Sequence, residues 1–292
     1  MNIAPRYLGR GSWLSRRDPR VLLISLAFFV FSVIQVWDLR ILAGLALIAA
    51  IYYRSARIPF RQVRMQWGYV AFFISFVVIV NTLLTGGELR GYTEEQLHVY
   101  FRLPLFGTPI SAESLSYAGA QILRFGSMAA LGFPIAFAIA PGDIGPAFAR
   151  LGVPYKFAYG LELTFRFVPS LAADMQTTID AQRIRGYEWE KRGRTPIGKL
   201  TRTIPLLTPV TINAIVGAED TIDAMDLRGF GTQKRTWLRQ LAFDSVDRAV
   251  VIGFGALLVL ITFLSFSGLT ELWVPPQLID LAWSGRLWKH GG

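Results

Sequence analysis

Five apolar runs dominate the pattern of hydrophobic and polar positions along the chain. They cover residues 21–36, 41–53, 68–84, 115–140 and 249–266, and charged residues fall mainly between them. A helix that crosses a bilayer needs about 20 apolar residues, so each run predicts a span, although the first two are somewhat short. The pattern therefore predicts an all-α integral membrane protein with about five transmembrane helices.

Arginines on both sides of the first two runs indicate how these runs are arranged. Five precede the first run (Arg6, Arg10, Arg16, Arg17, Arg20), and four follow the second (Arg54, Arg57, Arg61, Arg64). Because positive flanks stay in the cytoplasm, two such ends require an even number of crossings. We therefore expect a helical hairpin and a cytoplasmic N-terminus. No small-x-small cleavage signal follows the first run, so we expect a retained helix.

The segment 85–114 has the opposite charge balance. Its acidic residues (Glu88, Glu94, Glu95, Glu113) outnumber Arg90 and Arg102, which predicts an extracellular loop. Within it, HVYFRLPLFGTPIS at 98–111 alternates in polarity and is broken by proline and glycine, as in a short β-hairpin.

The segment 143–247 is helical in pattern but mixed in polarity. Its apolar runs are shorter than a span and contain Pro205 and Pro209, which favours amphipathic helices on or under the membrane. We divide the chain into N-terminal transmembrane helices (1–142, with the loop 85–114), a cytoplasmic helical region (143–247), and a C-terminal transmembrane helix with its tail (248–292). Three tryptophans after the last run are expected interfacial anchors: Trp273, Trp283 and Trp288.

Composition agrees with a membrane protein. Of 292 residues, 52% are hydrophobic and 17% charged, and the mean hydropathy is +0.40. The net charge of +10 lies mostly in the predicted cytoplasmic loops, so topology explains it better than nucleic-acid binding does. With no cysteine and two histidines, disulfides, thiolate chemistry and most zinc or haem sites are excluded.

Two stretches of the basic region share one skeleton. AQRIRGY at 181–187 and AMDLRGF at 224–230 both read Ala, three variable residues, Arg, Gly, aromatic. On a helix the alanine and the arginine lie on one face, and glycine after arginine is suited to a left-handed C-terminal cap. Each stretch therefore predicts a helix end that presents an arginine able to bind carboxylates or exposed carbonyls of a partner. Arg-Gly is a common helix ending, so only the occurrence of both copies in one basic segment favours function.

These residues resemble the transmembrane T component of energy-coupling factor (ECF) transporters, which carries two Ala-x-x-x-Arg-Gly-like signatures at the ends of cytoplasmic coupling helices. The stretch LGVPYKFAYGLELTFRFVPSL at 151–171 is also similar to the family's entry into the coupling region. The resemblance is specific over about 145–235.

The resemblance implies a coupling scaffold in the cell membrane of a prokaryote. It would join two cytoplasmic ABC-type ATPase subunits to a small membrane subunit that binds a vitamin or metal ion, and it would be neither an enzyme nor a cofactor-binding protein. Carried over, Arg185 reaches one ATPase and Arg228 the other, Ala181 and Ala224 permit close approach, and Gly186 and Gly229 end the helices. Four further residues are expected to support these contacts: Arg183, Met225, Asp226 and Phe230. The sequence does not identify the cargo.

Two other functions are alternatives: a membrane prenyltransferase-like enzyme and a secondary transporter. Glu219, Asp220, Asp223 and Asp226 lie at helical spacing, which resembles the Mg²⁺-binding carboxylates of membrane prenyltransferases, although only one such cluster is visible. A secondary transporter would need charged or broken helices at mid-membrane, and the spans offer little beyond Arg124 and Pro134. The chain has no P-loop pattern, so ATP hydrolysis by that route would need a partner. Glu162 and Arg166, four residues apart, are expected to pair within their helix.

Overall fold

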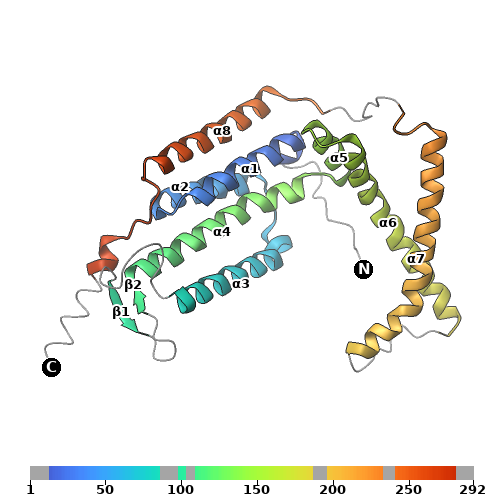
Figure 1. Cartoon of the computed structure of the whole chain (residues 1–292), viewed down its shortest axis with the longest axis horizontal. Coiled ribbons are helices and arrows are strands. Elements are labelled where there is room, and N and C mark those ends of the chain that lie inside the picture. The colour runs from blue at the N-terminus through green and yellow to red at the C-terminus, as the bar shows by residue number, and fades with distance from the viewer. Residues whose placement is uncertain (1–12, 86–97, 103–108, 187–195, 233–240, 281–292) are drawn as a thin grey trace. The chain divides into compact units, whose positions relative to one another are not determined.

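The computed structural model describes residues 13–85, 98–102, 109–186, 196–232 and 241–280. They form a short 3₁₀ helix (Leu14–Arg16), helices α1 (Pro19–Gln35), α2 (Leu39–Ser55), α3 (Phe60–Thr85), α4 (Ala112–Ala138), α5 (Pro141–Arg150), α6 (Tyr155–Ile184), α7 (Pro196–Leu227) and α8 (Ser245–Phe266), and strands β1 (Val99–Arg102) and β2 (Pro109–Ser111). Figure 1 shows these elements. The prediction of an all-α membrane protein is confirmed.

The chain divides into two compact units. The spanning unit contains Leu8–Ile139 and Ala242–Gly292, and the α5–α7 unit contains Ala140–Leu241. Each unit is described by itself below.

The first apolar stretch forms two helices, as the arginine flanks predicted, and an aspartate caps the beginning of each. The Asp18 side chain accepts from the Arg20 backbone N–H at 2.9 Å, and Asp38 accepts from that of Arg40 at 2.7 Å. An N-cap aspartate satisfies amides that the first helical turn leaves unpaired. The helices α1 and α2 therefore begin at Pro19 and Leu39, and two helices replace one long helix.

Three described helices are long and apolar enough to cross a membrane: Phe60–Asn81 of α3, Ala112–Ala138 and Ser245–Phe266. The helices α1 and α2 have 17 residues each. At 1.5 Å per residue, 17 residues extend about 25 Å, slightly less than a hydrocarbon core of about 30 Å. A count of five crossings stays a prediction.

Helices α1, α2, α4 and α8 share an apolar core in the spanning unit. Phe29, Leu42 and Leu131 are fully buried within it, and the rings of Phe29 and Tyr52 each lie 6.2 Å from that of Phe254, edge to face. Helix α3 packs on α4 and leaves large side chains outside, with Phe72 74% exposed. An apolar outer surface is expected where lipid replaces water.

Arg124 is the charged residue that the sequence places inside a span. It is 7% exposed, and its guanidinium donates to the carbonyl of Val36 and lies 3.7 Å over the ring of Trp37. Trp37 in turn stacks on Tyr117 of α4 at 5.3 Å. Intramembrane charges default to a functional reading, but these contacts give Arg124 a structural role, because it ties α4 to the turn between α1 and α2.

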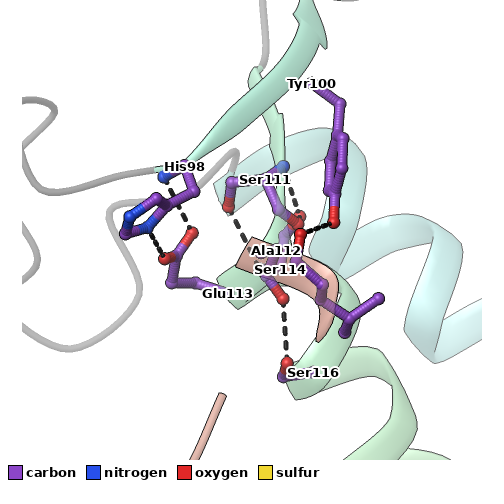
Figure 2. Close-up of polar contacts among 8 residues, drawn as sticks. His98, Tyr100, Ser111, Ala112, Glu113, Ser114 and Ser116 are labelled. Carbon is purple, nitrogen blue, oxygen red and sulfur yellow. Dashed lines mark hydrogen bonds and ion pairs between the residues drawn. The ribbon is translucent and has the colours of Figure 1, made fainter. Parts of the chain in front are cut away.

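The predicted β-hairpin is present as a two-stranded antiparallel ribbon, with Val99 opposite Ser111. Figure 2 shows how it joins the start of α4: His98 Nδ1 lies 2.7 Å from Glu113 Oε1, and the His98 backbone N–H donates to Glu113 Oε2 at 3.2 Å. Tyr100 donates its hydroxyl to the Leu278 carbonyl. Its extracellular location stays a prediction, and most of the loop 85–114 lies outside the described residues.

The expected anchor Trp273 lies beside α2. The guanidinium of Arg40 is 3.5 Å from the centroid of its ring, a cation–π arrangement at the end of the helix. Trp283 and Trp288 lie outside the described residues.

The α5–α7 unit consists of one short and two long helices. Helix α5 packs closely on α6, since a Cβ placed on Gly145 would lie 2.8 Å from Glu162 Cβ and 2.9 Å from the Ala158 carbonyl. Helix α7 has 32 residues and continues through Pro205 and Pro209. The prolines therefore do not break the segment, because a helix can accommodate a lost hydrogen bond when packing supports it.

Candidate functional site

The first signature lies at the C-terminal end of α6. Arg185 is the C-cap, and Gly186 follows in a left-handed conformation with φ +82°. The Gly186 backbone N–H donates to the carbonyl of Arg183 at 3.0 Å, the geometry of a glycine-terminated helix. Ala181 and Arg185 are both exposed. The predicted helix end is therefore present, with its arginine on the surface.

The second signature ends α7 in the same way and more completely. Gly229 has φ +63°, and its N–H donates to the Asp226 carbonyl at 2.8 Å, while the Phe230 N–H donates to the Met225 carbonyl at 3.0 Å. These two bonds are the pair that defines a Schellman motif. Ala224 and Arg228 are exposed. Asp226 and Met225 thus support the helix end through their carbonyls.

An aromatic cluster anchors the end of α7 to the beginning of α6. The ring of Phe230 lies 4.7 Å from Tyr159 and 5.8 Å from Tyr155, and these two tyrosines stack on each other at 6.2 Å. Aromatic contacts at such distances contribute about 0.5–1.5 kcal/mol each beyond the area that they bury. Phe230, predicted as a supporting residue, therefore fixes the position of the second signature. The tyrosines had been missed, although their spacing of four residues in YKFAY puts them on one helix face.

A hollow of about 370 Å³ lies between α6 and α7 beside Arg228. Its lining combines charged and apolar side chains from both helices: Tyr159, Leu163, Arg166, Phe167, Asp220, Thr221, Ala224, Met225, Arg228 and Phe230. Arg228 therefore lies near the N-terminal half of α6, whereas Arg185 lies at that helix's C-terminal end. At 1.5 Å per residue, the 19 to 26 residues between 159–166 and 185 correspond to roughly 30–40 Å. One binding groove on a partner could not hold both arginines.

Each signature arginine follows a large aliphatic residue that is almost fully exposed. Ile184 is 89% exposed and Leu227 is 91% exposed. Each helix end therefore offers an apolar and a cationic side chain next to each other, and a protein partner can contact both. Both residues occupy variable positions of the shared skeleton, and both are branched aliphatic residues.

The Glu162–Arg166 pair predicted within the helix is present as a charge interaction, because the charge of Arg166 lowers the pKa of Glu162, but not as an ion pair in contact. Glu162 comes no closer than 4.0 Å to Arg166 within the described chain, and its Oε2 is buried without a hydrogen bond there. Burial raises the pKa of Glu162, and the charge of Arg166 opposes that rise. The reason is the close packing at Gly145, which directs α5 against this side of Glu162.

The four carboxylates that suggested a prenyltransferase-like enzyme do not form a metal site. Glu219, Asp223 and Asp226 are exposed, and Asp220 lines the hollow with Arg166 and Arg228. Among the residues that the structure describes, no three acidic or histidine side chains are grouped to hold a metal ion. Chemistry on a Mg²⁺-bound diphosphate would use two buried acidic clusters that face each other. These four carboxylates do not form such an arrangement.

Comparison with known proteins shows the family of the chain. A family model described as "CbiQ: Cobalt transport protein" matches residues 10–237. An "Energy-coupling factor transporter transmembrane protein EcfT" of Leuconostoc gelidum subsp. gasicomitatum is 27% identical over 264 residues, covering 85% of this chain and 92% of the relative. Proteins of the same description from Lactococcus lactis and Bacillus subtilis are 29% and 24% identical, over 88% and 90% of this chain and 95% and 97% of theirs.

The apolar spans and the matches to known proteins define a membrane-embedded component of a transporter. The chain belongs to the CbiQ cobalt transport protein family, and it is the transmembrane component of an energy-coupling factor transporter. The resemblance given by the two signatures is thereby confirmed. The roles of the individual signature residues stay predictions.

Proposed function

We propose that this chain is the coupling subunit of an ECF-type ABC importer in a prokaryotic cell membrane, with a cytoplasmic N-terminus. Two ABC-type ATPase subunits bind the two signature ends, and their ATP-driven movement passes through α6 and α7 to a small membrane subunit that binds a vitamin or metal ion. Any such coupling requires contacts that differ between the states of the ATPase pair.

One observation carries this proposal: the two signatures form equivalent, glycine-ended surfaces at separate places. Each surface presents an arginine next to a nearly fully exposed aliphatic residue, Ile184 or Leu227. Their separation of roughly 30–40 Å along α6 fits two similar partners better than one. The arginine supplies a directional, charge-assisted contact, and the aliphatic side chain supplies apolar area that water leaves on binding.

Charge reversal of both arginines tests the proposal. A charge-assisted hydrogen bond contributes about 1.5–3 kcal/mol, so Arg185→Glu or Arg228→Glu alone weakens ATPase binding about tenfold or more. Together they abolish it. The measurement is recovery of the ATPase subunits with the tagged chain from detergent-solubilised membranes.

Arg150→Glu is the matched control. Arg150 is also exposed in the last turn of a helix that ends with a left-handed glycine, Gly152 at φ +99°, but it belongs to neither signature. This variant retains both ATPases. Recovery of an intact complex with the doubly reversed chain would refute the proposal, as would equal loss with Arg150→Glu.

A further inference from the structure

A second hollow, distinct from both signatures, lies at the C-terminal end of α2. It has a volume of about 790 Å³ and is lined by Ile51, Tyr53, Arg54, Ser55, Arg57 and Ile58. Arg54 and Arg57 are exposed. Ile51 and Leu47, one helical turn apart and each 63% exposed, continue from the hollow as an apolar row along α2. The site therefore has a cationic end and an adjoining apolar track.

The charge of this region is not balanced by acidic residues of the same segment. Residues 39–87 contain no aspartate or glutamate but hold Arg54, Arg57, Arg61 and Arg64 near the α2–α3 connection. In the part of the chain that the structure describes, none of these four arginines forms an ion pair. Arg61 and Arg64 also occupy the first two turns of α3, where the helix dipole disfavours cations. An anion bound here would relieve this repulsion.

The backbone at Arg57 has a conformation that favours glycine. Arg57 follows the C-cap Ala56 with φ +51°, and among the described residues it is the non-glycine residue with positive φ. After α5, α6, α7 and α8 the equivalent left-handed position is glycine: Gly152, Gly186, Gly229 and Gly268. The left-handed conformation costs an ordinary residue free energy that glycine avoids. The positive-inside preference explains a cation in this connection, but not at this strained position.

Aromatic side chains place the hollow at the membrane interface. Tyr53 lines it, and the Trp67 indole N–H donates to the Tyr53 hydroxyl at 3.3 Å. Tyrosine and tryptophan concentrate at the depth of lipid headgroups. Beyond Trp67, helix α3 is apolar and exposed at Phe72 and Phe76, as a lipid-facing helix should be. Headgroup phosphates are the anions available at that depth.

We propose that this hollow binds an anionic phospholipid. Arg54 and Arg57 donate hydrogen bonds to oxygens of the headgroup phosphate, and one acyl chain lies along Ile51 and Leu47. The site is independent of the proposed ATPase contacts, because it shares no residue with them.

Thermal unfolding of the full purified chain in neutral detergent tests this proposal. Phosphatidylglycerol raises the unfolding temperature of the wild type, whereas phosphatidylcholine and inorganic phosphate at equal concentration do not. Arg54→Gln and Arg57→Gly each weaken the lipid response by about fivefold or more. Arg57→Gly also raises the unfolding temperature without lipid, because glycine relieves the left-handed strain, so its lost lipid response is not a folding defect.

Arg64→Gln is the matched control, since it removes the same charge from the same segment but does not line the hollow. It keeps most of the response. Equal responses in all variants would show attraction to surface charge only and overturn the proposal. A response to inorganic phosphate as large as that to phosphatidylglycerol would overturn the lipid assignment. Absence of any response to phosphatidylglycerol in the wild type would overturn the proposal as well.

Discussion

The two signature ends have the same backbone cap but different surroundings. At the end of α7, Phe230 packs against Tyr155 and Tyr159, so Arg228 is held beside the start of α6. At the end of α6, Arg185 follows Ile184, whose side chain is 89% exposed, and the described residues around it form no comparable cluster. A short motif can therefore dictate how a helix ends without dictating how rigidly that end is held. We expect the α7 end to be pre-organised and the α6 end to be ordered more by its partner.

Removal of the aromatic anchor has the largest expected effect on this contrast. Phe230→Ala destabilises the α7 end by about 2–3 kcal/mol, less than the loss of a fully buried phenylalanine because Phe230 is half-buried. Ile184→Ala, at an exposed position of the other end, changes stability by less than about 0.5 kcal/mol. Hydrogen exchange of the Gly229 and Phe230 amides measures the first effect locally. Equal exchange in the wild type and Phe230→Ala would show that the aromatic cluster does not hold this end.

Replacement of the two signature glycines, Gly186 and Gly229, has a smaller expected effect on stability and compares the two helix ends directly. Alanine at either left-handed position costs about 1–2 kcal/mol. At Gly229 a new Cβ would also lie 3.1 Å from Thr232 Oγ1, whereas at Gly186 nothing in the described part of the chain lies within 4 Å. Gly229→Ala is therefore the more destabilising of the two in thermal unfolding. The reverse order would mean that the α6 end is the more constrained one.

Replacement of Glu162 has the smallest expected effect on stability. Because burial raises its folded-state pKa, the ionised carboxylate destabilises the folded chain, and stability increases as the pH falls through that raised pKa toward the unfolded value. Glu162→Gln raises the unfolding temperature at neutral pH by an amount equivalent to about 1 kcal/mol or less, since the side chain is half-buried and screened. It also removes the gain on acidification. A fall in unfolding temperature would instead reveal a stabilising partner for the carboxylate.

Local patterns in the sequence predicted much of this structure. The Arg-Gly pairs predicted two helix ends, and the arginine flanks predicted two helices in place of one across residues 21–53. The alternation in HVYFR predicted a strand, which the structure contains as β1. These features depend on neighbours within a few residues, where cap chemistry and side-chain periodicity decide the outcome.

Contacts between distant segments were beyond the reach of the sequence. Helical spacing predicted that Arg166 acts on Glu162, but not that α5 approaches Glu162 closely at Gly145. The packing of Phe230 on Tyr155 joins residues 75 positions apart, and no local pattern encodes it. The exposure of Ile184 and Leu227 is likewise a property of the folded chain, since some aliphatic residues elsewhere in it are buried and others are exposed.

Site-directed crosslinking tests the central claim most directly, and the natural chain suits it because it contains no cysteine. Single cysteines replace Arg185, Arg228 or, as a control, Arg150, and each variant is crosslinked in membranes that contain the whole transporter. The account predicts that Arg185→Cys and Arg228→Cys each crosslink to an ATPase subunit, to different subunits where the two differ, and that Arg150→Cys does not. Failure of both signature cysteines to reach an ATPase, or equal crosslinking from Arg150→Cys, would contradict it.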